Sequence, residues 1–124
     1  MRQIWTRIED FDTTDEVIKW HLQHGWVYLG RDEAERPVAL LYLTIICGHG
    51  VVLHYSDLGI KVSIHFYREA LRQALAFLRR DAGVIYATIP KKLVRIQKLV
   101  RHLGFVAIDR FGEYIFFRDT LSGE

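Results

Sequence analysis

The sequence is poor in the features that would cross-link the chain or carry it into a membrane. Cys47 is the only cysteine, so no internal disulfide can form, and a single buried thiol is typical of a reducing compartment. The longest apolar run, Val38 to Cys47, is far shorter than the roughly 20 residues of a membrane-spanning helix. The first ten residues contain no apolar segment like that of a signal peptide. We therefore expect a soluble, cytoplasmic protein that contacts no membrane.

The chain also lacks a large excess of positive or negative charge. The chain has 17 basic and 15 acidic residues, a net charge of +2, which is too small by itself to indicate a nucleic-acid-binding protein. Its 124 residues suffice for one hydrophobic core, and no linker, repeat or low-complexity tract divides them. We expect residues 1–124 to form a single domain.

Hydrophobic periodicity and turn residues predict seven strands and three helices. The strands are expected at residues 3–8, 26–30, 38–47, 51–55, 83–89, 105–109 and 113–118. The helices are expected between Thr13 and Gly25, and at residues 63–80 and 91–103. The order β-α-β-β-β-α-β-α-β-β predicts an α+β fold: a mixed, mostly antiparallel sheet with helices on both faces. The crossover through the second helix makes its two flanking strands parallel.

The faces of the first two helices follow from their sequences. Thr13 is expected to cap the first helix, with Glu16 reaching back to the Thr13 amide. Its buried side is expected to carry Val17, Ile18, His21 and Leu22. On the second helix, Arg79 is expected on the polar face, with the other charged residues.

The stretch Gly83 to Asp119 has a strand, a helix ending at Leu103-Gly104-Phe105, and then a hairpin rich in aromatic residues, Tyr114 to Phe117. In these features, the last third of the chain resembles the GNAT superfamily of acyl-CoA-dependent N-acetyltransferases. The element order extends the resemblance over most of the chain. It implies a GNAT-like fold and, if the chemistry is kept, acetyl-CoA as the acyl donor.

The chain departs from the family pattern where the coenzyme would bind. The family has a motif of Arg or Gln, two residues, Gly, one residue, and Gly or Ala at the start of the helix after the fourth strand. Its glycines let backbone amides approach the pyrophosphate. The matching stretch here, Lys61 to Tyr67, contains no glycine. An Asn and a Tyr that the family often carries on the next helix fall on Leu93 and Val100. We therefore favour a protein that holds no cofactor.

An enzyme reading remains open as the alternative. The family's general base often lies on or near the fourth strand, where this chain has His54, Tyr55 and Asp57. As an enzyme, the protein would use His54 or Asp57 as the base. Its coenzyme would be held by Lys61, Ser63, Ile64, His65 and Arg68. Without the acyl-CoA motif, we favour His54 as a strand histidine satisfied by local hydrogen bonds.

Metal binding and cysteine chemistry have little support. Cys47, His49 and His54 surround one hairpin, and His21 and His24 are three residues apart on the first helix. Neither set has the spacing of a metal site, so no metal is expected. Cys47 is better explained as a small buried hydrophobic residue in a strand.

The strongest polar feature is the basic face of the third helix. It carries Lys91, Arg95, Lys98 and Arg101, with no acidic residue between Lys91 and Ile108. The face is either ordinary solvated surface or a docking site for an acidic protein partner, a nucleic-acid backbone or the CoA 3′-phosphate. Phe111 at the last hairpin could add a subunit contact. Since stacking aromatics are not interleaved with these charges, nucleic-acid binding is a weaker, third reading.

These losses also resemble small GNAT-like proteins of tailed phages, which lack the acyl-CoA motif and serve in head assembly or inside the virion. The resulting main hypothesis is a non-catalytic protein that acts through protein contacts or self-association, in a host cytoplasm or a virion. An N-acetyltransferase with an atypical coenzyme site is the alternative.

Overall fold

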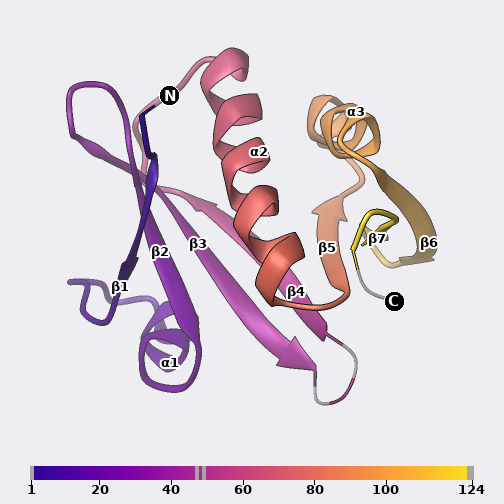
Figure 1. Ribbon diagram of the computed structural model, residues 1–124, viewed down its shortest axis with the longest axis horizontal. Helices are drawn as coiled ribbons and strands as arrows, with labels where there is room; N and C mark the ends of the chain where they lie inside the picture. The colour runs from indigo at the N-terminus through magenta and orange to yellow at the C-terminus, as the bar shows by residue number, and fades with distance from the viewer. Residues whose placement is uncertain (1, 47, 49, 123–124) are drawn as a thin grey trace. The chain divides into compact units, whose positions relative to one another are not determined.

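The computed structural model describes residues 2–46, 48 and 50–122, and its elements follow the predicted order (Figure 1). The strands are β1 (Trp5–Ile8), β2 (Trp26–Arg31), β3 (Pro37–Ile46), β4 (Gly50–Asp57), β5 (Ile85–Pro90), β6 (Phe105–Phe111) and β7 (Tyr114–Asp119). The helices are α1 (Glu16–His24), α2 (Ile64–Asp81) and α3 (Val94–His102). Cys47 and His49 lie outside the described residues, so the interpretations placed on them stay predictions.

The seven strands form one mixed sheet in the order β1-β2-β3-β4-β5-β7-β6, which confirms the predicted α+β class. β1 pairs antiparallel with β2, and β2 with β3. β4 and β5 run parallel on either side of the α2 crossover, as predicted, while β7 pairs antiparallel with both β5 and β6. No helix in the described part of the chain is both long and apolar enough to cross a membrane.

The helix starts differ from the sequence predictions at two places. α1 is capped by Asp15, not Thr13, because the Asp15 carboxylate accepts hydrogen bonds from the amides of Val17 and Ile18. The Thr13 hydroxyl instead accepts from the Asp15 amide, and Glu16 pairs with Lys19 at 3.3 Å. α3 begins at Val94, not Lys91, because Pro90 and a turn precede it.

The chain divides into two compact units, residues 1–44 with 54–74, and residues 45–53 with 75–124. The prediction of a single domain stays a prediction. Each unit is described on its own below.

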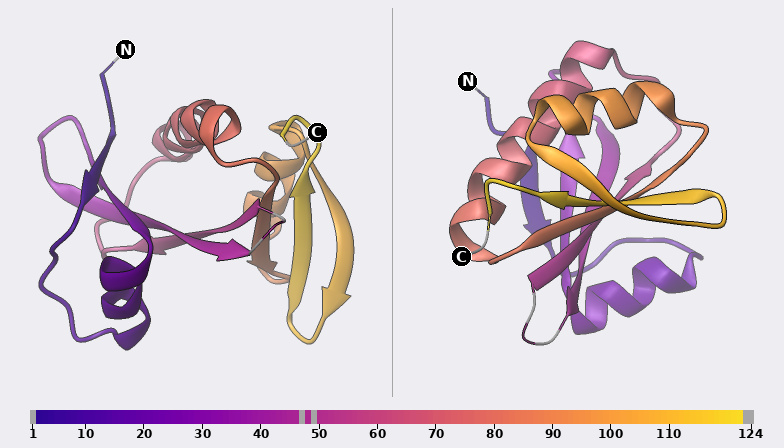
Figure 2. Two further views of the ribbon diagram at one scale, coloured as in Figure 1. Left: turned by 60° about the horizontal axis from the view of Figure 1, so that its bottom comes forward. Right: turned by 90° about the vertical axis from the view of Figure 1, so that its right-hand side faces the viewer.

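In the first unit, strand pairing sorts side chains onto two buried faces. Ile18 of α1 packs on Val27, Leu29 and Leu40, and Leu22 adds to this cluster. Val17, in contrast, is exposed, so its predicted place on the buried side is wrong. The start of α2 covers the opposite face (Figure 2).

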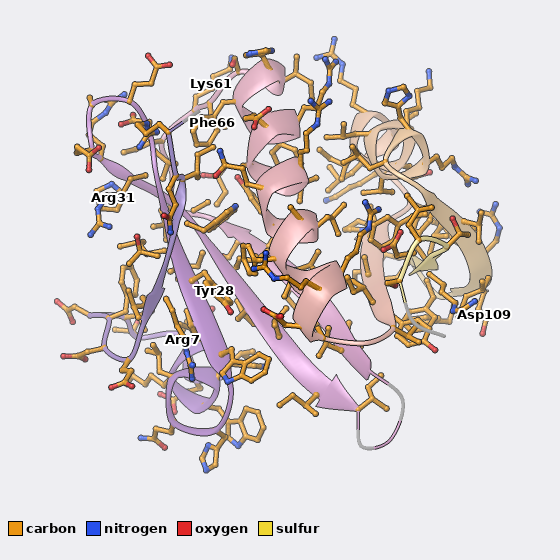
Figure 3. All side chains as sticks on the ribbon, in the orientation of Figure 1. Arg7, Tyr28, Arg31, Lys61, Phe66 and Asp109 are labelled. Carbon is orange, nitrogen blue, oxygen red and sulfur yellow. The ribbon has the colours of Figure 1, made fainter. Side chains whose placement is uncertain are left out.

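Trp5 anchors that opposite face of the first unit. Its ring nitrogen donates a hydrogen bond to the Ala70 carbonyl of α2 at 2.7 Å. Gly30 lies directly across the ladder, and a Cβ there would come within 2.8 Å of the Trp5 ring, so the close packing depends on glycine. Nearby, the Arg7 guanidinium lies 5.5 Å from the centre of the Trp26 ring (Figure 3).

In the second unit, a buried ion pair joins the second half of α2 to β7. The Arg79 guanidinium donates two hydrogen bonds to Asp119, at 2.7 and 2.9 Å, and a third to the Leu103 carbonyl at the end of α3. Asp119 is fully buried and also accepts from the Leu121 amide. The prediction that Arg79 lies on the polar outer face of α2 is therefore wrong, because its guanidinium turns inward to this carboxylate.

Candidate functional site

A chain of hydrogen bonds links α1, β3 and β4 within the first unit. The Nδ1 atom of His21 lies 2.8 Å from the Val17 carbonyl oxygen, one turn earlier on α1. The Nε2 atom of His21 lies 3.0 Å from the Thr44 hydroxyl on β3. That hydroxyl in turn lies 2.9 Å from Nε2 of His54 on β4. We call this set, His21, Thr44 and His54, the histidine network.

The Val17 carbonyl fixes the direction of the histidine network. A carbonyl oxygen only accepts, so Nδ1 of His21 must carry a hydrogen, and in the neutral ring Nε2 is then an acceptor. Thr44 has one hydroxyl hydrogen, which it donates to His21, and so it accepts from His54 Nε2–H. Neutral His54 therefore keeps a bare lone pair on Nδ1. No hydrogen bond to that nitrogen occurs among the described residues.

Aromatic rings surround the histidine network. Tyr42 stacks on His54, with ring centroids 5.1 Å apart, and also contacts His21 at 4.8 Å. Burial, and to a lesser extent the charge of His21, lowers the pKa of His54 below its ordinary value. His54 is thus uncharged at neutral pH, the state in which an imidazole can accept a proton. The geometry suits a general base at Nδ1.

Asp57, the other predicted base, does not join His54. Neighbouring side chains of a strand alternate between faces, and Asp57 lies three residues from His54. Its carboxylate accepts from the Gly59 amide at 2.8 Å. Burial and the Asp57 charge together raise the pKa of Tyr55 to about 12. Tyr55 contacts Tyr67 of α2 and Trp5, which places it on the Trp5 face of the sheet.

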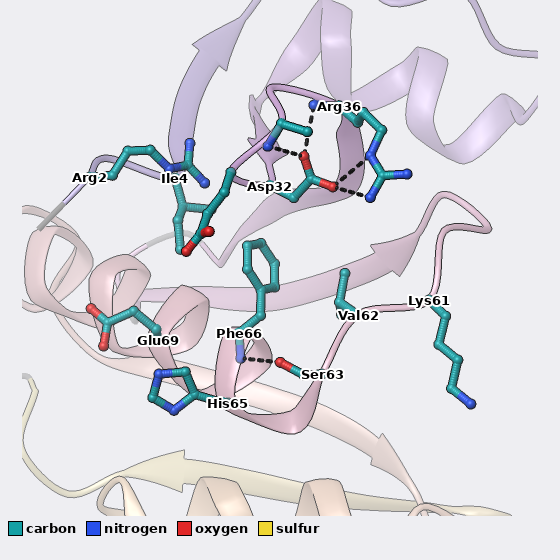
Figure 4. A pocket seen from close by; sticks show the side chains of 12 residues that line it. Arg2, Ile4, Asp32, Arg36, Lys61, Val62, Ser63, His65, Phe66 and Glu69 are labelled. Atoms are coloured by element: carbon teal, nitrogen blue, oxygen red, sulfur yellow. Dashed lines mark hydrogen bonds and ion pairs between the residues drawn. The ribbon is translucent and has the colours of Figure 1, made fainter.

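A pocket of about 490 Å³ opens beside the start of α2 (Figure 4). Of the residues predicted to hold a coenzyme, it brings together Lys61, Ser63 and His65. Ile64 and Arg68 do not line it. The Phe66 ring points into the pocket from α2.

The opposite wall of the pocket belongs to the turn between β2 and β3. Asp32 there pairs with the Arg36 guanidinium at 2.7 Å. The Arg36 amide, followed by its guanidinium and the Ala34 amide, holds the pKa of Asp32 below its ordinary value. Because Asp32 and Arg36 satisfy each other, Lys61 remains the pocket cation without an ion pair among the described residues.

The start of α2 offers hydrogen-bond donors that suit an anionic group. Its side chains, however, prevent such a group from approaching the backbone closely. Its first turn has no acidic residue, and Ser63 uses its hydroxyl to accept from the Phe66 amide. The amides of Ile64 and His65 have no hydrogen-bond partner in the described chain and point out of the helix end. With Lys61, they form a donor set that suits phosphate oxygens. Side chains in place of the family's glycines hold such a group further from the backbone.

The family's positions on α3 are clearly non-catalytic in this chain. Leu93 is the N-cap residue and is 42% exposed, while Val100 is buried in the second unit. Neither side chain can exchange a proton.

The predicted partner-binding residues lie in the second unit. Arg95 and Lys98 are exposed on α3, and Lys91 is exposed in the turn before it. Arg101 is exposed too, and its guanidinium lies 5.2 Å from the Phe117 ring centre. Phe111 is 49% exposed and touches Tyr114 and Phe116. Whether this surface binds a partner stays a prediction.

A metal site needs several ligating side chains close together. Among the residues that the structure describes, no group of three or more His, Asp, Glu or Cys side chains is placed to hold an ion. His21 and His24, paired in the sequence, point to different partners, because His24 bonds to the Trp20 carbonyl and stacks on the Trp20 ring.

Sequence reasoning missed Thr44 and the role of His21. The available signal was alternation: Thr44 follows buried Leu43, and His54 follows buried Leu53, so each lies on the other side of its strand from a core leucine. That pattern places polar groups on one face of two neighbouring strands. It does not give the register that brings Thr44 against His54.

Comparison with known proteins adds the fold family. No model of a protein family and no curated protein sequence matches this chain. Solved structures do match. An IAA acetyltransferase from Bacillus cereus ATCC 14579 superposes with a TM-score of 0.73 at 12% identity, covering 94% of this chain and 97% of its own.

A second match was solved with coenzyme A. The spermidine N-acetyltransferase of Vibrio cholerae, in complex with CoA and spermine, superposes with a TM-score of 0.67 at 15% identity. The match covers 87% of this chain and 74% of the enzyme. At such identities the likeness concerns the fold alone. The seven-stranded mixed sheet and three helices of this chain have the fold of the GNAT acetyltransferases.

Proposed function

We propose that the protein is an acyl-CoA-dependent N-acetyltransferase with an atypical coenzyme site. The observation that carries the proposal is the Nδ1 atom of His54, which has no hydrogen-bond partner among the described residues. A hydrogen-bond chain holds its ring on the central strand of a fold that acetyltransferases use. This reverses the order of the two hypotheses from the sequence. The absence of glycines had favoured a non-catalytic protein, in which His54 is a strand histidine satisfied by local hydrogen bonds. The bond to Thr44 engages only its Nε2 atom, and Nδ1 has no partner among the described residues.

The chemistry assigned to His54 is proton removal from an amine. Acetyl-CoA, when bound, supplies an activated thioester carbonyl. An alkylammonium group must lose a proton before its nitrogen can attack such a carbon, and a neutral imidazole at hydrogen-bond distance can take that proton. The lowered pKa of His54 keeps the ring uncharged for this role at neutral pH.

The start of α2 would hold the coenzyme's phosphates. Lys61 and Arg68 supply charge, and the Ile64 and His65 amides supply donors. Because no glycine allows a closer contact, we expect weaker coenzyme binding than a glycine loop would give.

The second candidate function is that of a non-catalytic protein with the same fold. Its specific support is that Lys61 to Tyr67 lacks glycine while Leu93 and Val100 replace proton-exchanging residues. Such a protein would act by protein contacts through Lys91, Arg95, Lys98, Arg101 and Phe111, as a head-assembly or virion component of a phage does. None of the structural matches described above is a phage protein.

Calorimetry with acetyl-CoA separates the two candidates. We expect a dissociation constant between about 10 µM and 1 mM, an interaction of roughly 4 to 7 kcal/mol. Lys61→Ala should weaken it, and Lys19→Ala, an exposed lysine on α1, should not. No heat at millimolar coenzyme, together with no acetylation of a panel of amines, would reject the enzyme. Gel filtration and partner capture would then test the second candidate.

A further inference from the structure

The histidine network contains two imidazoles, yet a general base needs only one. His21 is buried, with 6% of its surface exposed, and both of its ring nitrogens are engaged. A buried histidine needs hydrogen-bond partners in any role, but here the partner of Nε2 is a hydroxyl that also bonds to a second imidazole. This link between two rings raises the question of what Thr44 and His21 do for His54.

We infer that His21 and His54 together take up one added proton, and that Thr44 passes it from His54, the reacting ring, to the buried ring of His21. His54 is the catalytic residue, while Thr44 and His21 are positioning residues that act through it. The catalytic use of the pair rests on the proposed function, but the shared proton itself does not.

The transfer balances atom by atom. In the resting state, His21 carries hydrogen on Nδ1 and His54 carries it on Nε2. When His54 Nδ1 takes a proton, the His54 Nε2 hydrogen can move to the Thr44 oxygen as the Thr44 hydrogen moves to His21 Nε2. His54 is then neutral with hydrogen on Nδ1, and His21 is the imidazolium. The Val17 carbonyl keeps accepting from His21 Nδ1 in both states, so this hydrogen bond survives the transfer.

Two features around His21 favour positive charge and oppose the cost of charging a buried ring. His21 lies in the last turn of α1, where the helix dipole favours positive charge. The rings of Trp20 and Tyr42 lie 5.0 and 4.8 Å from its centre. Among the described residues, the other titratable groups near the pair are Tyr42, with Asp15 acting on it, and His24 on the far side of Trp20. Tyr42 stays neutral because burial and then the Asp15 charge raise its pKa.

Nitrogen-15 NMR of the histidine rings tests the inference without any substrate. Bare and protonated ring nitrogens have well-separated shifts. At high pH, we expect His54 to carry hydrogen on Nε2 and His21 on Nδ1. On acidification, both rings should respond in a single first step that takes up one proton per pair. A His54 ring with hydrogen on Nδ1 at high pH would overturn the inference, even if no variant could be made.

Variants then isolate the bridge. Thr44→Val removes the hydroxyl at almost constant volume, and we expect the two rings to titrate independently. Thr44→Ser restores the hydroxyl and should restore the coupled step. His24→Gln changes an exposed histidine of the same helix and should leave the titration of His21 and His54 unchanged. Unchanged titration in Thr44→Val would reject the role of Thr44.

The failure of this inference is distinguishable from failure of the proposed function. In an active enzyme, Thr44→Val should lower kcat about tenfold with little change in KM, because the amine still meets His54. Absence of acetyl transfer by the wild-type protein would end the enzyme proposal but leave the ring titrations as they are. Full activity in Thr44→Val would leave the shared proton without a catalytic use.

Discussion

Each of the two units of the molecule contains a buried polar network, and these two networks end differently. In the second unit, Asp119 receives two hydrogen bonds from Arg79 and one from the Leu121 amide, and Arg79 gives its third to the Leu103 carbonyl. The Arg79 guanidinium neutralises the Asp119 carboxylate, and both carboxylate oxygens accept hydrogen bonds. In the first unit, the histidine network starts at a backbone carbonyl and ends at a bare ring nitrogen on His54.

The difference separates structural from chemical use of buried polarity. A closed network stabilises its surroundings because breaking it leaves a buried charge without a partner. An open network of neutral groups contributes less to stability, and its last member retains the capacity to bind a proton or a ligand. The four predictions below test this contrast, beginning with the largest expected effect.

Removing the carboxylate of the closed network should produce the largest loss of stability. Asp119→Ala leaves the Arg79 guanidinium partly buried without its counter-charge. We expect the free energy of unfolding to fall by about 3 kcal/mol, from the usual cost of breaking a buried ion pair. Urea denaturation followed by circular dichroism measures it.

The matched control is the neighbouring ion pair on the surface. Arg80 lies 3.5 Å from Asp81, with both side chains largely exposed. Arg80→Ala should change the free energy of unfolding by less than about 0.5 kcal/mol. Equal effects of the two substitutions would remove the distinction drawn for the closed network.

Removing the end of the open network should affect chemistry more than stability. His54→Gln should lower kcat for amine acetylation about 100- to 1,000-fold, the usual contribution of a general base. Its free energy of unfolding should fall by only about 1 kcal/mol, because the glutamine amide can still donate to Thr44. Steady-state kinetics and urea denaturation on the same preparation provide both numbers. A variant that unfolds readily but retains full turnover would contradict the contrast.

The cap of α1 is the next test, because this helix carries His21. Asp15→Ala should cost about 1 kcal/mol of unfolding free energy, a normal value for an N-cap residue. Thr13→Ala should cost less, since Thr13 only supports the Asp15 amide. Thermal melts of both variants decide between them. The reverse ranking would restore Thr13 as the cap.

The smallest expected effect is the pH dependence that His54 gives to stability. Its folded-state pKa lies below the ordinary value of 6.5, so the unfolded chain binds more protons between the two values. The free energy of unfolding should therefore decrease as pH falls from above 6.5 through the folded-state pKa, and stay constant above that window. His54→Gln should flatten the slope. Urea titrations at several pH values measure it, and an equal slope in the variant would assign the effect elsewhere.

Much of the fold was predictable because it depends on local patterns. α2 was expected at residues 63–80 and is found at Ile64–Asp81, since its apolar stripe has a strong helical period. The parallel pairing of β4 with β5 follows from the crossover between them. The cap of α1 was misplaced by two residues because Thr13 and Asp15 both suit an N-cap, and only the backbone geometry decides.

The site was much less predictable, since its parts come together across the sheet. His54 was named as a candidate from its place on the fourth strand. Thr44 was not, because a threonine in an apolar strand is also a good β former and carries no chemical signal alone. Arg79 was assigned to the surface because helical periodicity describes where a Cβ points. A long side chain can turn back from that direction to reach a buried carboxylate.

The carbonyl of Val17 has a consequence for the timing of any chemistry at His54. Only an intact helix from Val17 to His21 holds this oxygen against the ring, and short helices open and close on submicrosecond to microsecond scales. Each opening releases the constraint on His21, and through Thr44 the constraint on which nitrogen of His54 is bare. A nine-residue helix would thereby set how large a fraction of the molecules is competent as a base at any instant. The basicity of His54 on β4 would then depend on how often α1 unfolds locally.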